Sequence, residues 1–326
     1  MIDEIISFNS KYVAIAFDHM ACDFTEVLCP AEGVFVCPKV PFNIDHRWQE
    51  WIGTLKTNEV TKANLVLIST LRSSSPTVMD AETLRLEATV LKLWYSILLL
   101  GVPAYSSANV ISGGRLDSEV QIRQFSRLPT FYRGPQSPLF RLKSDLFPKA
   151  GRFFEVINKI YANPNKFTQL RRGLKAFQKA LAESADYDRL HGFVRSLDAI
   201  VMTDKSRGRK SFIQRCRLFL HLKPMSDVTL GLMYDLRSRV EHQSDWYDLF
   251  SGAIDSERSV QASLITKQAE MLARAAYQVV LMDEDLLSLF ENTDVIKTIW
   301  TSGDLDRFHV DEELKVDLSS GLTLLE

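Results

Sequence analysis

The sequence predicts an α+β protein in which a β-rich mixed domain, residues 1–150, precedes an all-α helical bundle, residues 151–326, that ends in an acidic tail. Three observations predict this class. Short β-branched and aromatic runs mark the first part, helical periodicity marks the second, and 46% hydrophobic with 25% charged residues is an ordinary globular composition. This composition excludes disordered, collagen-like and coiled-coil chains.

Three strands and one long helix are predicted in the first part. The strands are Tyr12–Phe17, Gly33–Cys37 and Asn64–Leu71, and the last is expected to be central because it is apolar on nearly every residue. Asp80 to Leu100 has helical spacing, with Asp80 as its cap. The stretch beyond it, rich in Pro and containing the turn signal Gly113-Gly114, predicts loops and short strands.

Five helices are predicted in the second part. Four of them run through Phe167–Leu181, Tyr187–Met202, Ser211–Leu222 and Glu257–Met282. The remaining helix, fourth in chain order, begins near Ser226, and loops are predicted at Asp204–Lys210 and Trp246–Gly252. Apolar residues at four-residue steps predict the inward face of the fourth helix: Val228, Leu232, Leu236 and Val240.

The chemistry of the chain favours a reducing, cytoplasmic setting. Its four cysteines are scattered, and Met1 to Glu4 is acidic where a signal peptide needs positive charge. The most apolar run, Trp94–Val102, is too short to cross a bilayer. The set His19, Cys22, Cys29 and Cys37 is a weak zinc alternative because its spacing is irregular. We therefore expect no metal, no cofactor and no membrane partner.

Charge is distributed unevenly along the chain. Residues 151–223 hold 16 Lys and Arg against 6 Asp and Glu, a balance of +10, although the whole chain carries −2. A polyanion partner would explain this excess. Solvated helix faces, neutralised by the acidic remainder of the chain, are the alternative explanation.

The fourth helix ends in a dense polar cluster that runs from Tyr234 to His242. Arg237 and His242 are five residues apart, about 7.5 Å along a helix axis, and a long Arg and a terminal His can still reach one phosphate. A structural explanation competes. Asp235 with Arg239 and Arg237 with Glu241 have the i,i+4 spacing of surface ion pairs, and a His at a helix C-terminus suits the macrodipole.

The pattern Tyr234-x-x-Arg237-Ser238-x-x-x-His242 resembles the signature of the HEPN superfamily, in its Apea-like form. Three further stretches resemble the helices of that family: 171–177, 193–200 and 212–216. The similarity covers about residues 160–290. Two positions depart from the family pattern, since Asp198 stands where Glu is common and Gln243 where Gly is common.

The resemblance implies a metal-independent endoribonuclease that acts as a homodimer in phage defence or toxin-like growth arrest. Arg237 and His242 would be catalytic, supported by Tyr234, Ser238, Arg239, Glu241 and Asp198. Basic residues would contact RNA: Arg171, Arg172, Arg195, Arg207, Arg209, Lys210 and Arg215. The N-terminal domain would sense a regulatory ligand or a phage component. A non-catalytic interaction or sensor module, acting through dimerisation, remains the alternative.

Overall fold

The computed structural model describes residues 2–17, 20–102, 108–117, 119–128, 140–204, 206–220, 227–242, 249–250 and 254–302. The chain divides into two compact units, 1–158 and 159–326, and the division lies inside helix α5, Leu146–Ala162, which also contains the predicted boundary at 150. The fold class is α+β. Several predictions lie outside the described residues: those on His19, Ser226, Gln243, most of Trp246–Gly252 and the tail from Asp304.

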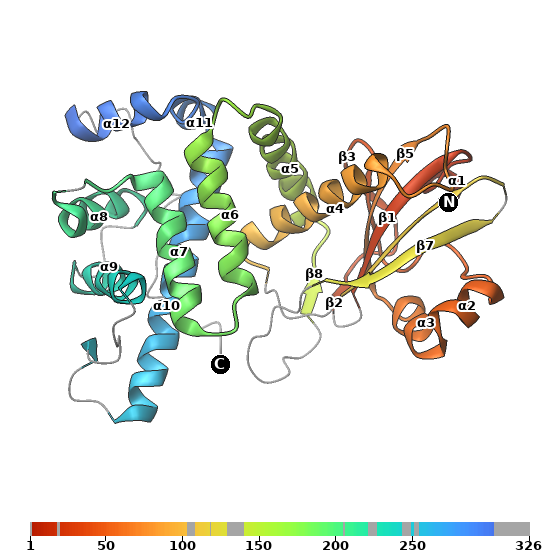
Figure 1. Ribbon diagram of the computed structural model, residues 1–326, viewed down its shortest axis with the longest axis horizontal. Helices are drawn as coiled ribbons and strands as arrows, with labels where there is room; N and C mark the ends of the chain where they lie inside the picture. The colour runs from red at the N-terminus through yellow and green to blue at the C-terminus, as the bar shows by residue number, and fades with distance from the viewer. Residues whose placement is uncertain are drawn as a thin grey trace. The chain divides into compact units, whose positions relative to one another are not determined.

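A six-stranded antiparallel sheet forms the centre of the first unit (Figure 1). Its order is β3-β4-β5-β1-β6-β7, and the strands are Leu28–Ala31 (β3), Val34–Cys37 (β4), Leu65–Arg72 (β5), Ser10–Phe17 (β1), Ala108–Arg115 (β6) and Val120–Arg127 (β7). Met20–Cys22 (β2) and Phe140–Leu142 (β8) form a separate parallel pair. The three predicted strands are confirmed as β1, β4 and β5, and β5 lies inside the sheet as expected.

Helices cover both faces of this sheet. Ala81–Leu99 (α4) packs on β1 and β5, where its Trp94 meets Phe17 with 4.6 Å between ring centroids. The predicted cap is confirmed, because the Asp80 carboxylate accepts the backbone N–H groups of Glu82 and Thr83. Alternate β1 residues face the opposite core, which includes Val60 and the partly buried Trp48. The remaining short helices are Ile2–Ile5 (α1), His46–Ile52 (α2) and Thr54–Thr61 (α3).

Gly113 and Gly114 lie inside β6, so their interpretation as a turn is wrong. Both are needed for close approach rather than for a turn. A Cβ on Gly113 would lie 1.8 Å from the Gln121 carbonyl oxygen, where the β6–β7 register shifts. A Cβ on Gly114 would lie 1.6 Å from the carbonyl oxygen of Pro76.

We therefore expect Gly114→Ala to destabilise the first unit. The new methyl group meets backbone rather than a movable side chain, and overpacking of this kind costs about 1–3 kcal/mol or more. Urea unfolding of the full chain measures it, with Ser126→Ala on the neighbouring β7 as the control. Equal unfolding midpoints for the two variants would contradict the close contact.

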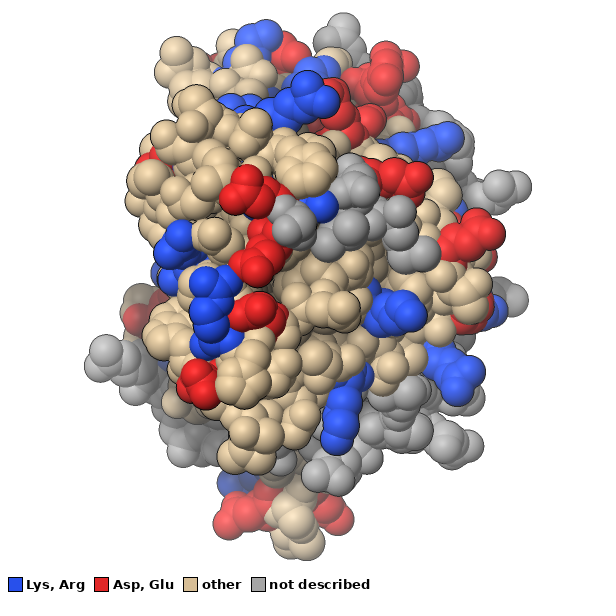
Figure 2. Space-filling model, turned by 90° about the vertical axis from the view of Figure 1, so that its right-hand side faces the viewer, with Lys and Arg blue, Asp and Glu red and all other residues tan. Residues whose placement is uncertain are grey.

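Figure 2 shows the face of the molecule that lies on the right-hand side in Figure 1. Lys and Arg side chains are interspersed there with Asp and Glu, and neither sign covers a continuous area of the coloured residues. Among the described residues, no helix is both long enough and apolar enough to span a membrane.

The second unit is helical. Its elements are Thr168–Ala182 (α6), Asp186–Val201 (α7), Gly208–Cys216 (α8), the 3-10 turn Arg217–Phe219 (η1), Asp227–Glu241 (α9), Asp255–Met282 (α10), Glu284–Leu289 (α11) and Thr293–Ser302 (α12). Helix α7 contacts α6, α8, α9 and α10, and it therefore forms the centre of the bundle (Figure 1). The five predicted helices are confirmed with shifted ends. The predicted loop Asp204–Lys210 extends too far, because α8 begins at Gly208 and residues 208–210 are helical.

The predicted inward face of α9 is wrong in its rotation. Val228 is 73% exposed, Leu232 and Val240 are only partly buried, and Leu236 alone of the four is fully buried. The buried residues of α9 are instead Leu230, Gly231, Met233 and Leu236. Contacts with α7 and α8 select this face, and they leave an apolar stripe of α9 partly open to solvent.

Candidate active site

A pocket of about 250 Å³ in the second unit gathers five of the predicted site residues. Arg172 from α6, Arg195 and Asp198 from α7, and Arg237 and Glu241 from α9 line it. Three guanidinium groups and two carboxylates give this pocket a formal charge of +1. It is the place where the predicted catalytic Arg meets the predicted RNA-binding residues.

Arg237 lies between the two carboxylates. One of its terminal nitrogens is 3.1 Å from Glu241 Oε1 and 3.6 Å from Asp198 Oδ2, and the side chain is 16% exposed. Its guanidinium carbon lies 5.7 Å from the centre of the Tyr234 ring. Its Nε–H is buried and donates no hydrogen bond to a described residue, so this Arg keeps an unused donor.

Arg172 and Arg195 are both exposed, and neither forms an ion pair with a described residue. Their helices approach closely beside them. A Cβ on Gly173 would lie 2.6 Å from the Ala199 Cβ and 1.8 Å from Tyr277 Oη, so only Gly permits this approach. The Ser196 hydroxyl also donates to the Gly173 carbonyl at 2.9 Å. Two cations without ion-pair partners among the described residues thus line the pocket, and such arginines suit an anion.

His242 follows directly after α9 and does not line the pocket. It is exposed, and its backbone N–H donates to the Ser238 carbonyl at 3.1 Å. It adjoins Glu241, which does line the pocket. A second histidine, which was not predicted, lies nearby: His191 Nε2 on α7 is 3.4 Å from Glu241 Oε1. Its position four residues before Arg195, on the same helix face, was the signal that could have identified it.

The other supporting residues have structural contacts. Asp198 Oδ1 accepts the Thr203 hydroxyl at 2.6 Å and its backbone N–H at 3.0 Å. The Tyr234 ring packs on Phe212, with centroids 5.6 Å apart. Arg239 is partly buried, and its predicted pair with Asp235 does not form.

Asp235 instead binds the Arg209 guanidinium, with Nε and Oδ2 2.9 Å apart. The second predicted i,i+4 pair, between Arg237 and Glu241, does form. The polar end of α9 is therefore tied partly to its own helix and partly to α8.

The predicted RNA-binding residues fall into three groups. Arg172 and Arg195 line the pocket, whereas Arg207, Arg209 and Lys210 lie exposed around the start of α8. Arg171 is partly buried at the start of α6, where it donates to the Pro164 carbonyl.

Arg215, which was also predicted to contact RNA, is engaged by the fold. It is 6% exposed, and its guanidinium donates to the carbonyls of Val201 at 2.9 Å, of Met202, and of Trp300 at 3.2 Å. It also binds Asp204 Oδ1 at 2.9 Å. Arg215 therefore holds the turn after α7 and is not available to a backbone phosphate.

The zinc alternative gains no support in the described part of the chain. No group of three His, Cys, Asp or Glu side chains is gathered there. Burial raises the pKa of Cys37 to about 12, so its thiol stays protonated and suits packing rather than metal binding. Cys22 donates to the Phe24 carbonyl at 3.4 Å.

Comparison of the chain with protein-family models, with curated proteins and with solved structures finds no match in any of the three.

Proposed function

We propose that the protein is a metal-independent endoribonuclease of the HEPN type that acts in the cytoplasm. It cleaves RNA through attack of an RNA 2′-hydroxyl on the neighbouring phosphate. The observation that carries this proposal is the pocket in which Arg172, Arg195 and Arg237 meet Glu241, the residue that precedes His242. The resemblance adds the biological setting of phage defence or toxin-like growth arrest.

The three arginines suit the phosphate of this reaction. Arg stays protonated at neutral pH, and its planar fork pairs with phosphate oxygens. Arg237 is 16% exposed, and a charge in such a partly desolvated place stabilises a developing phosphorane more than it would in water. Asp198 and Glu241 fix its orientation at 3.6 Å and 3.1 Å while its Nε–H remains without an acceptor.

His242 supplies the proton transfer. Histidine is the side chain whose ordinary pKa lies nearest neutrality, and its exposed position at the end of α9 leaves it accessible to substrate. One His cannot act as base and acid on opposite sides of one phosphorus at the same time. A two-fold homodimer supplies two such residues, and the partly open stripe of α9, with Val228, Leu232 and Val240, suits such a seam.

Incubation of the purified protein with RNA in excess EDTA tests the proposal. We expect cleavage to continue, because no step uses a divalent ion. A second candidate, a non-catalytic assembly module, is favoured by the ion pairs that already engage Arg237. Absence of cleavage with a preserved dimer would support that candidate instead.

The composite site predicts complementation between two inactive chains. We expect a mixture of Arg237→Ala and His242→Ala chains to regain part of the wild-type rate, because a heterodimer keeps one intact copy of each residue. Cleavage assays after co-refolding measure this. Mixing that restores nothing, together with wild-type activity proportional to concentration far below the dimer dissociation constant, would rule the composite site out.

A further inference from the structure

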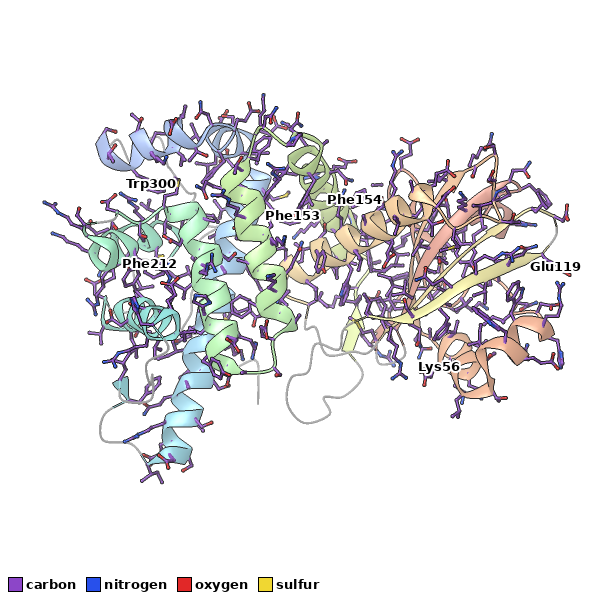
Figure 3. The ribbon with its side chains drawn as sticks, in the orientation of Figure 1. Lys56, Glu119, Phe153, Phe154, Phe212 and Trp300 are labelled. Atoms are coloured by element: carbon purple, nitrogen blue, oxygen red, sulfur yellow. The ribbon has the colours of Figure 1, made fainter. Side chains whose placement is uncertain are left out.

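A second and larger cavity, of about 420 Å³, adjoins the arginine pocket. The two cavities share Gln169 and Asp198 as lining residues, so they are adjacent. The larger cavity lies between the turn after α7 and helix α12, which contributes Lys297 and Trp300 (Figure 3). Its volume lies within the range of about 300–1,000 Å³ that is typical of small-molecule sites.

The wall of this cavity is held rigidly. Met202 has a left-handed backbone, with φ of 46°, which is a strained conformation for a residue other than Gly. The buried Arg215 holds it there through the carbonyls of Val201 and Met202, and links it to α12 through the Trp300 carbonyl. The Arg215 guanidinium also lies 5.1 Å from the centre of the Trp300 ring. Met202 therefore ends α7 in a conformation that the buried Arg215 holds in place.

The Asp204 carboxylate is an acceptor in the wall of the cavity. Asp204 Oδ1 accepts Arg215 at 2.9 Å, while its Oδ2 has no hydrogen-bond partner among the described residues. Asp204 is 37% exposed, so this oxygen can accept from a ligand. The Lys297 ammonium, from α12, is a donor elsewhere in the lining.

We propose that this cavity binds a guanine base of the RNA substrate. Guanine presents N1–H and N2–H₂ side by side, and one carboxylate can accept both, here that of Asp204. Its O6 is an acceptor that suits the Lys297 ammonium, which has three N–H donors and directs one of them to Asp294. Adenine has an acceptor at N1, which would face the carboxylate and be repelled.

The identity of the ligand as RNA rests on the proposed function, but the base preference can be measured without any cleavage. Asp198 borders both cavities, so the RNA backbone that carries a base bound beside Asp204 lies next to the arginine pocket. The larger cavity thereby gives the proposed nuclease a preference for guanine next to the phosphate that the arginine pocket binds.

Calorimetric titration of the full chain with GMP, IMP and AMP tests this proposal. The three ligands carry the same phosphate, so their differences report the base alone. We expect GMP to bind at least about tenfold more tightly than AMP, and IMP, which lacks the N2 amino group, to be intermediate. Equal affinities, or no detectable binding of any of the three, would overturn the proposal.

Two variants locate the preference. Asp204→Asn keeps an oxygen for Arg215 but turns an amide N–H₂ toward the base, so we expect it to abolish the preference for GMP. Asp285→Asn, an exposed change on α11, is the matched control and should keep that preference. Unchanged discrimination in Asp204→Asn would overturn the assignment.

A third variant separates this proposal from the proposed function. In Arg237→Ala we expect GMP and AMP to weaken equally, with the preference for GMP retained, because Arg237 lines only the smaller pocket. Selective GMP binding in a protein that cleaves no RNA would refute the nuclease and leave the guanine site standing. RNA cleavage without base selectivity in binding would refute the guanine site alone.

Discussion

Arg237→Ala and His242→Ala are each expected to lower RNA cleavage by at least about 10²-fold while the protein stays folded. Arg237 is the cation that the pocket holds between Asp198 and Glu241, and His242 is the proposed proton carrier. Neither belongs to the buried apolar face of α9, so we expect the fold to survive both substitutions. Initial cleavage rates and circular dichroism spectra of both variants measure the two parts of this expectation.

Matched controls make the result specific. Arg152→Ala removes an exposed Arg of α5, and His46→Ala removes a His that is 79% exposed in the first unit. Both controls should cleave at the wild-type rate. Wild-type rates in Arg237→Ala and His242→Ala would refute the catalytic assignment, and loss of the native spectrum in both would show that the end of α9 is a structural network.

Glu270→Ala is expected to destabilise the second unit by about 3–5 kcal/mol. Glu270 is 5% exposed on its side chain and binds two buried arginines, Arg274 at 2.6 Å and Arg189 at 3.2 Å. Removal of the carboxylate leaves two cations facing each other without their shared anion. The free energy of unfolding, measured in urea, gives the effect directly.

Two comparisons identify the cause of that loss. Glu183→Ala, at the exposed end of α6, removes a carboxylate without such partners and should change stability by less than about 0.5 kcal/mol. Replacement of Arg189, Glu270 and Arg274 together by Met should recover most of the loss, because no buried charge then remains. A Glu270→Ala protein as stable as the Glu183→Ala protein would show that the buried ion network contributes nothing.

Helices and strands that are marked by neighbouring residues in the sequence could be predicted. Asp80 precedes a long apolar periodicity, and its carboxylate caps α4 as expected. Helix α5 was not predicted from the sequence. Pro148 lies in the first turn of α5, where a missing N–H removes no helical hydrogen bond, and Phe153 and Phe154 then pack in the core (Figure 3).

Features that depend on contacts between helices could not be predicted. Two apolar stripes of α9 pass through Leu236, one containing Leu232 and the other Met233, and periodicity alone cannot choose between them. Packing on α7 and α8 chooses Met233. In the same way, the sequence lists Arg195, Arg215 and Arg237 as similar cations, but folding places Arg215 in the interior and the other two around one pocket.

The chemical ends that cleavage leaves on RNA distinguish attack by the 2′-hydroxyl from attack by water. Attack by the 2′-hydroxyl at the Arg237 and His242 site predicts a 2′,3′-cyclic phosphate on one fragment and a 5′-hydroxyl on the other. It also predicts that a single 2′-deoxy substitution at the cleaved position blocks the cut in EDTA. Mass spectrometry of the fragments measures both. Fragments with 3′-hydroxyl and 5′-phosphate ends, or cleavage of the deoxy substrate, would contradict the account.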